Sequence, residues 1–212
     1  RLKFFSSGWP KLRESKGGIE KYEGVKLATN KSRDGKWVHT RKIEINTFDL
    51  GDHQVLIEGK LADTRTSHSP SGEPEGGPVL VHHLTARLWV QGPDLTISAV
   101  EAEMPTIPRE ICPQALPAVQ KLAGLKIITG FTQKVKDLIG DVKGCSHLTN
   151  LFLTLGPVAF QGYFAAYGRR PGARSLDNPS LSRVIDSCHV WRKDGPHVKS
   201  LAAALEREKK GK

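Results

Sequence analysis

Alternation of apolar and polar residues dominates the first half of the chain. It is clearest over residues 79–90, where leucine, alanine and valine side chains alternate with polar ones, and this period is typical of a strand with one buried face. The same period recurs over residues 37–48, 53–61 and 95–104. Turn residues or a Gly/Pro-rich loop separate these stretches, so consecutive strands can pair in antiparallel fashion. The pattern predicts an antiparallel meander of about four strands.

The apolar period lengthens to that of helices in the second half. Residues 113–123 and 132–139 are predicted to form two helices, and Gly140 is expected to end the second. A third helix is predicted to start after Gly144, because leucine and phenylalanine residues recur there at helical spacing. Pro157 is expected to kink or interrupt this third helix, since proline lacks the N–H that a helix interior needs.

The C-terminal part is predicted to contain a short extended segment at residues 184–191 and a surface helix at residues 196–210. We see no internal repeat in the sequence. Strands followed by helices define an α+β fold, with the helices packed on one face of the sheet.

The length of 212 residues favours a single domain. Residues 1–35 are rich in Gly, Lys and Ser and are expected to be an irregular N-terminal segment. Residues 36–198 are expected to form the α+β domain, and residues 199–212 a charged C-terminal helix or tail. The Gly/Pro-rich stretch at 66–78 is predicted to be a loop, of the kind that often carries function near a site.

The formal net charge of +10 raises the question of nucleic-acid binding, because clustered Lys and Arg neutralise phosphates. The basic residues are scattered, however, and no recognition helix, zinc finger or aromatic RNA-binding stripe is visible. Specific nucleic-acid binding is therefore not expected. An anionic small-molecule ligand or an acidic partner protein would explain the charge equally well.

No apolar run approaches the roughly 20 residues needed to span a bilayer, and no leader segment is recognised. We therefore expect a cytoplasmic protein without a membrane association. The three cysteines are odd in number and widely spaced, which argues against a disulfide framework. Reduced thiols are expected.

Two cysteines lie at predicted helix starts. Cys112 precedes Pro113, which suits the first helical position, so Cys112 is predicted to be the N-cap. Cys145 lies at the start of the third helix. The partial positive charge of a helix N-terminus favours a thiolate. The alternative is that each cysteine is a small buried apolar residue.

Histidines adjoin two of the thiols, in Cys145-Ser146-His147 and in Cys188-His189. Neighbours on a regular strand face opposite ways, so one member of each group is a better ligand candidate than both. The sequence lacks a tight Cys-x-x-Cys or His-Glu-x-x-His motif. A metal site would have to be assembled from distant segments.

Polar residues also occupy inward positions of the predicted strands. His82 falls on the apolar face of its strand, and His39 and Arg41 share the apolar face of the first strand. Two roles remain open for Arg41. Its guanidinium could clamp an anionic ligand, or it could pair with a carboxylate such as Glu58 or Asp63.

Five stretches together resemble a bacterial family known as domain of unknown function 2889. They are residues 37–43, 59–64, 111–113, 144–148 and 186–189. The resemblance spans about residues 38 to 198, and the Gly-Cys-x-His-Leu and Cys-His elements are its most specific parts. Membership in this family implies a fold and a site, but no activity.

A more distant resemblance connects the order of these motifs with the iron–sulfur cluster scaffold fold. In those scaffolds three cysteines converge on zinc or a cluster. The resemblance implies His82, Cys112 and Cys145 as ligands here, with Cys188 or His189 as a fourth. Because His82 stands where the scaffold has a cysteine, zinc or iron bound by mixed Cys/His ligands is a better expectation than cluster transfer.

We therefore expect a protein that acts on a small molecule, such as a lyase or hydrolase for an aromatic or acyl substrate. A metal or Cys145 would be its reactive centre, with His82 or His147 as acid or base. Arg41 would orient an anionic group, and His39 would line the same pocket. The alternatives are a non-enzymatic carrier of a metal or an iron–sulfur cluster, and an interaction module with inert thiols.

Overall fold

The computed structural model of the chain describes residues 37–66, 76–168 and 184–210. The expectations for residues 1–35, and for most of the loop at 66–78, concern positions outside these described residues. The boundaries proposed for the α+β domain, at residues 36 and 198, stay predictions.

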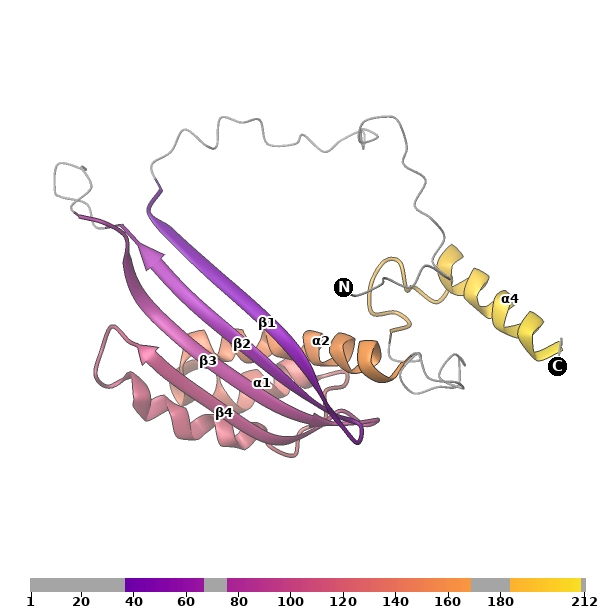
Figure 1. Cartoon of the computed structure of the whole chain (residues 1–212), viewed down its shortest axis with the longest axis horizontal. Helices are drawn as coiled ribbons and strands as arrows, with labels where there is room; N and C mark the ends of the chain where they lie inside the picture. The colour runs from indigo at the N-terminus through magenta and orange to yellow at the C-terminus, as the bar shows by residue number, and fades with distance from the viewer. Residues whose placement is uncertain (1–36, 67–75, 169–183, 211–212) are drawn as a thin grey trace, which may run out of the picture. The chain divides into compact units, whose positions relative to one another are not determined.

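Four antiparallel strands form one sheet in the order β1-β2-β3-β4 (Figure 1). The strands are β1 (His39–Gly51), β2 (Gln54–Arg65), β3 (Val79–Gln91) and β4 (Thr96–Thr106). The predicted meander is thus confirmed. β2 is longer than predicted, because its ladder with β1 continues to the pair His39–Arg65. This extra length brings Asp63 into the sheet.

The two faces of the sheet differ as the alternation requires. Val55, Ile57 and Leu61 of β2 are fully buried on the inner face. The opposite face carries an ionic network, in which Arg87 of β3 pairs with Glu58 of β2 and with carboxylates of β4. The inner face therefore holds the core and, at one end, the polar residues described below.

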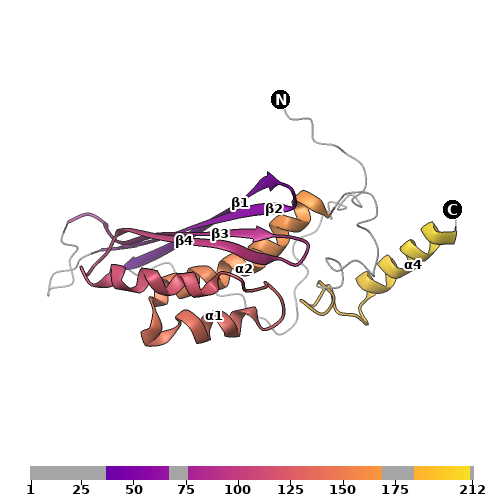
Figure 2. The same cartoon turned by 90° about the horizontal axis from the view of Figure 1, so that it is seen from below.

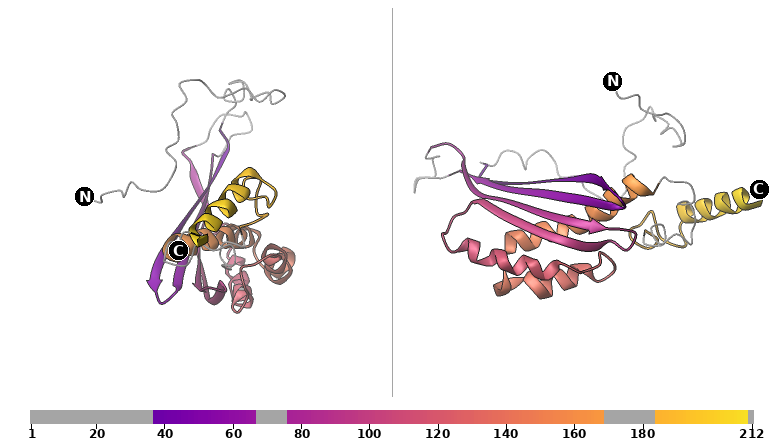
Figure 3. Two further views of the ribbon diagram at one scale, coloured as in Figure 1. Left: turned by 90° about the vertical axis from the view of Figure 1, so that its right-hand side faces the viewer. Right: turned by 60° about the horizontal axis from the view of Figure 1, so that its bottom comes forward.

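After the sheet come the 3-10 helix η2 (Cys112–Leu122), α1 (Phe131–Ile139), η3 (Asp141–Lys143) and α2 (Ser146–Tyr167). The views in Figure 2 and Figure 3 show η2, α1 and α2 on one side of the sheet. The α+β class is thereby confirmed. In the part of the chain that the structure describes, no helix is long and apolar enough to cross a membrane.

The extended segment predicted at residues 184–191 was wrong, and Pro157 does not interrupt α2. Pro157 lies inside α2, which continues to Tyr167, and a kink there stays a prediction. The side chain of Pro157 is exposed, so its ring faces away from the sheet. Residues 184–191 form turns, because Asp186 has a positive φ of 62° and its N–H donates to the carbonyl of Trp191. The helix α4 (Pro196–Lys210) matches the predicted C-terminal helix.

α2 crosses the inner face of the sheet at very short range. A Cβ atom built on Gly59 of β2 would lie 2.7 Å from Cδ2 of Leu155 and 3.1 Å from Cδ1 of Leu151. The missing side chain of Gly59 lets Leu151 and Leu155 of α2 pack directly on the backbone of β2. This contact determines how close α2 lies to the sheet.

Aromatic residues attach the C-terminal end of α2 to the β1–β2 turn. His53 Nδ1 lies 2.9 Å from the hydroxyl of Tyr163, and the His53 ring stacks on Tyr167 at 4.7 Å. The hydroxyl of Tyr167 also donates to Asp49. Because the C-terminal end of α2 packs on the β1–β2 turn, its N-terminal end lies at the opposite end of the strands, where Asp63 is located.

Candidate functional site

Three polar residues form a row across the inner face at one end of the sheet. Arg41 of β1 is in register with Asp63 of β2, and Asp63 is in register with His82 of β3. Residues in register on adjacent strands share a face and have Cβ atoms about 5 Å apart. Strand pairing alone therefore brings these three side chains together.

Asp63 is the central residue of this row. Its side chain is only 3% exposed, yet it is charged, and Arg41 compensates it with two hydrogen bonds of 2.7 Å, one to each carboxylate oxygen. These bonds from Arg41, opposed by burial, lower the pKa of Asp63 to about 2. The same pair raises the pKa of Arg41. Asp63 is thus an anion at any physiological pH.

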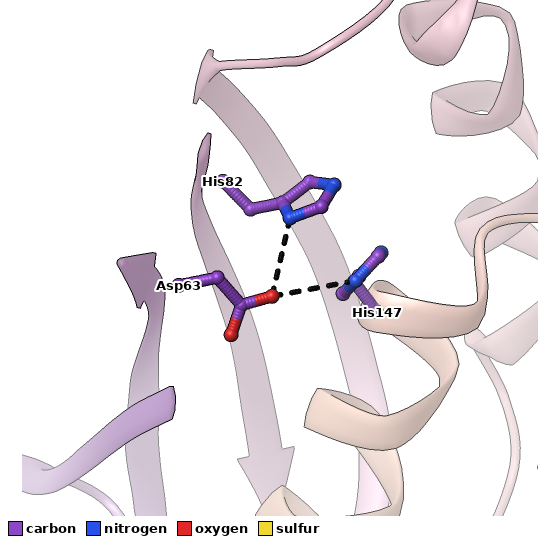
Figure 4. Close-up of side chains that lie close together, drawn as sticks. All are labelled: Asp63, His82 and His147. Atoms are coloured by element: carbon purple, nitrogen blue, oxygen red, sulfur yellow. Dashed lines mark hydrogen bonds and ion pairs between the residues drawn. The ribbon is translucent and has the colours of Figure 1, made fainter. Parts of the chain in front are cut away.

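Two imidazoles converge on one oxygen of this carboxylate (Figure 4). Nδ1 of His82 lies 3.1 Å from Oδ2 of Asp63, and Nε2 of His147 lies 3.4 Å from the same atom. The centroids of the two rings are 3.9 Å apart. His39 approaches the other oxygen, with Nε2 3.5 Å from Oδ1. The row from the sheet is thereby completed by a residue from the start of α2.

The surroundings of His147 favour its neutral form. Burial is the largest cause that lowers its pKa, followed by the nearby His82 and Arg41, while Asp63 acts in the opposite direction. A neutral imidazole has one nitrogen with a free lone pair. When the proton is on Nδ1, Nε2, which faces Asp63, is able to act as a ligand or as a base.

Cys145 lies beside the second nitrogen of His147. The Cys145 Sγ atom is 3.8 Å from Nδ1 of His147, and Cys145 is the N-cap residue of α2, as predicted. The His147 ring therefore lies between the Cys145 thiol on its Nδ1 side and the Asp63 carboxylate on its Nε2 side. Cys145 can thus hold His147 in the tautomer that carries its proton on Nδ1.

The cluster of Asp63, His82 and His147 has the dimensions of a metal site. One ligand atom from each lies within 4.8 Å of the other two. Two atoms that are each about 2.1 Å from an ion lie about 3.0 Å apart at a right angle and about 3.4 Å apart at the tetrahedral angle. The distances of 3.1 and 3.4 Å from the two imidazoles to Oδ2 fit this range.

The donor set also fits a metal chemically. The Arg41 hydrogen bond uses one of the two lone pairs on Oδ2, which leaves the other for an ion. Nitrogen and carboxylate donors suit zinc and iron. Metal-binding histidines usually donate their second N–H to a neighbouring group, and Cys145 stands in that place for His147. In the described ranges, these three residues are the one group of this kind.

Five of the predicted site residues lie in this region. His39, Arg41, His82 and His147 contact Asp63, and Cys145 contacts His147. The structure also chooses between the two roles left open for Arg41, because its guanidinium binds Asp63. A catalytic or metal-binding role for any of the five stays a prediction.

Cys112 lies outside the Asp63 cluster. It lines a pocket together with Cys145, so the two thiols do share one cavity. Its predicted N-cap position is wrong, because Ile111 is the N-cap of η2. The Cys112 N–H already donates to the carbonyl of Arg109, and the helical backbone therefore begins one residue earlier than expected.

Cys188 and His189 are not brought to the cluster either. Both are exposed and lie in the turns before α4. The His189 ring contacts the guanidinium of Arg192, and Cys188 lines an apolar pocket that contains Phe160 and Trp191. The metal set inferred from the iron–sulfur scaffold resemblance is therefore not assembled as one group in the described residues.

Asp63 is the residue that the sequence analysis treated only as a partner of Arg41. A usable signal was present, since Asp63 continues the inward series of Val55, Ile57 and Leu61 at the end of β2. A carboxylate in an apolar series needs partners to be buried. His82 takes the corresponding inward place on β3.

The fold and the site define an α+β protein with a buried aspartate and two half-buried histidines grouped under one end of an antiparallel sheet. The chain belongs to the family described as protein of unknown function (DUF2889), whose model matches residues 39–161. The match includes every residue of the Asp63 cluster and excludes Cys188 and His189. Comparisons with curated proteins and with solved structures gave no match. The expected likeness to iron–sulfur scaffolds thus lacks a structural relative that would support it.

Proposed function

We propose that Asp63, His82 and His147 bind one divalent metal ion, zinc or ferrous iron, and that the protein is a metal-dependent enzyme for a small organic molecule. The observation that carries the proposal is the convergence of two imidazole nitrogens on Oδ2 of a buried carboxylate, at 3.1 and 3.4 Å. Three protein ligands leave further coordination positions for water or substrate, as in catalytic sites.

A metal bound there would polarise a carbonyl or lower the pKa of a bound water, which suits the hydrolase or lyase chemistry expected from the sequence. The residues of this chain have separate tasks. Arg41 fixes the orientation of the Asp63 carboxylate through two hydrogen bonds. His39 is half-exposed beside Oδ1 and is placed to meet a group that enters from solvent.

The donor set argues against the alternative of an iron–sulfur cluster carrier. Such clusters are held mainly by cysteine thiolates, whereas the group in the described residues consists of one carboxylate and two imidazoles. Cys145 and Cys112 lie at a neighbouring pocket. A carrier of a single metal ion would use the same three ligands.

A second candidate uses the thiol without a metal. Cys145, His147 and Asp63 form a continuous series with 3.8 Å between Sγ and Nδ1 and 3.4 Å between Nε2 and Oδ2. This is the order of nucleophile, base and orienting carboxylate found in cysteine hydrolases. The 3.4 Å between Nε2 and Oδ2 is longer than an ordinary N–H···O hydrogen bond but suits two ligands of one ion, so the metal proposal fits the geometry better.

The test is the metal content of protein purified without an affinity tag. We expect about one zinc or iron per chain in the natural protein, since one ion needs all three ligands. His82→Ala should lose it. His83→Ala is the matched control, because His83 is the next residue of β3 and points to the opposite face. Equal metal content in the two variants, or none in the natural protein, would refute the proposal.

A further inference from the structure

The Asp63 cluster adjoins a pocket whose two walls come from different parts of the chain. One wall is the start of η2 with Ile111, Cys112 and Ala115, and the other is the junction of η3 and α2 with Val142, Lys143 and Cys145. Its volume is about 530 Å³, which falls in the range of small-molecule sites. Cys145 connects the two, because it lines the pocket and its Sγ lies 3.8 Å from Nδ1 of His147.

Apolar side chains stand uncovered at this pocket. Ile111 is 64% exposed and Val142 is fully exposed, although each is a large aliphatic residue that gains free energy from burial. They project from two separate elements that meet at the same cavity. A ligand with an apolar body would cover both at once, together with the thiols of Cys112 and Cys145.

The charge of the pocket has one sign. Lys143 is its single charged lining residue, and no carboxylate lines it. The Lys143 amine donates to the main-chain carbonyl of Asp137, which is a neutral group, and within the described ranges no carboxylate forms an ion pair with it. The pocket also opens on the N-terminal end of α2, where the Cys145 side chain makes no capping hydrogen bond. An anionic group is therefore favoured over a cationic one.

From these observations we infer that this cavity is the substrate pocket of the Asp63 cluster and that it takes small organic acids with an aliphatic or aromatic body. The inference rests on the proposed function, because it assigns the substrate class of the same site. The carboxylate would lie near Lys143, and the apolar body would lie against Ile111 and Val142. Cys145 would line the side of the pocket that is next to His147.

The three free cysteines provide the readout. Cys112 and Cys145 line the pocket, whereas Cys188 is exposed in another part of the chain. The probes are benzoate, cinnamate and hexanoate, each compared with its neutral amide and its amine. The measurement is the rate of alkylation of each cysteine by N-ethylmaleimide, followed by peptide mass spectrometry.

We expect at least one of the acids to slow the alkylation of Cys112 and Cys145. At about ten times its dissociation constant the rate should fall about ten-fold, since only the free fraction reacts. The reaction of Cys188 should be unchanged. The amide should protect less, and the amine should not protect. Equal slowing of all three thiols, or no slowing by any acid, would overturn the inference.

Two variants test the placement. Ala115→Trp fills the pocket and should remove the protection, while Ala123→Trp, at the exposed end of η2, should keep it. Lys143→Met should weaken protection by the acid about two- to five-fold, as expected for one exposed charge pair, with no change for the amide. Lys136→Met of α1 is its control. Identical behaviour of Lys143→Met and Lys136→Met would overturn the assignment of the carboxylate.

Metal analysis of the same preparations separates this inference from the proposed function. A protein that contains metal but shows no selective protection contradicts the pocket assignment and supports the metal site. A protein that shows selective protection without metal contradicts the metal site and supports the pocket. Ala115→Trp should retain its metal, because Ala115 is not part of the Asp63 cluster.

Discussion

Asp63 determines the chemistry of the site at the scale of single residues. A carboxylate that is 3% exposed would be costly to bury without partners. Arg41 compensates the charge with two hydrogen bonds, while the two imidazoles leave their nitrogens close to Oδ2. The carboxylate is therefore both anchored and able to bind a further positive group.

Replacing Arg41 should destabilise the protein. Arg41→Leu removes two hydrogen bonds to a buried charge, and a loss on the order of 2 kcal/mol in the free energy of unfolding is expected. Arg41 itself is about one-third exposed, and solvent limits the cost. Arg41→Lys should recover part of the loss, because the charge remains but the bidentate geometry does not. Urea denaturation at pH 7 measures both, and a loss below about 0.5 kcal/mol for Arg41→Leu would contradict this role.

At the scale of elements, the position of His147 depends on how α2 lies on the sheet. Gly59 permits close contact with Leu155, and the aromatic contacts of Tyr163 and Tyr167 attach the far end. His147, in the first turn of α2, is thereby brought under the end of β2. A change in the distance between α2 and the sheet should therefore move His147 relative to Asp63.

Gly59→Val should disturb this arrangement. Its Cβ would lie 2.7 Å from Leu155, and overpacking of this kind costs about 1–3 kcal/mol. Metal content should fall with stability, because His147 is displaced from Asp63. Gly77→Ala is the control, since a Cβ there meets nothing within 4 Å. Thermal unfolding and metal analysis test this, and normal metal content in a destabilised Gly59→Val would show that the depth of α2 does not set the site.

The ion pair of Arg87 and Glu58 on the outer face of the sheet should make the stability of the protein depend on pH. Hydrogen bonds from Arg87, ahead of the opposing effect of burial, lower the pKa of Glu58 from its ordinary value of 4.5. A lowered folded-state pKa gives stability that is present above the unfolded-state pKa and is lost as the pH falls through the folded-state value. Glu58→Gln should therefore be less stable than the natural protein at pH 7, and the difference should shrink below about pH 4. A difference that does not depend on pH would contradict the role of this ion pair.

At the scale of the whole molecule, the site joins three elements that are distant in sequence. Asp63 lies on β2, His82 on β3 and His147 on α2. Because the unfolded chain does not hold these ligands together, metal binding should also stabilise the fold. A bound ion would thus couple the site to the stability of the domain.

This coupling predicts a metal-dependent stability. At about 100 times its dissociation constant, added Zn²⁺ should raise the free energy of unfolding by about 2.7 kcal/mol. His82→Ala should show almost no increase, and His83→Ala should behave like the natural protein. Denaturation of chelator-treated protein with and without Zn²⁺ measures the effect. An equal increase in the His82→Ala variant would indicate binding elsewhere.

Much of this architecture was predictable from local sequence patterns. The alternation of apolar and polar residues predicted the four strands. It also predicted the inward positions of His39, Arg41 and His82. The position of Cys145 at a helix start was also predicted correctly. These features depend on neighbours along the chain, where spacing determines which face a residue occupies.

The convergence on Asp63 was not predictable in the same way. It depends on the register of β1, β2 and β3 and on where α2 crosses the sheet, and neither is determined by local spacing. Residues 184–191 were misassigned for a related reason. They were predicted to be extended, but the left-handed backbone of Asp186 makes a turn.

The most direct test of the metal proposal is a crystal of the protein prepared with Zn²⁺ and measured on both sides of the zinc absorption edge. We predict one anomalous peak about 2.1 Å from Oδ2 of Asp63, Nδ1 of His82 and Nε2 of His147. A map without a peak there, or with zinc held by the thiols of Cys112 and Cys145 instead, would contradict it.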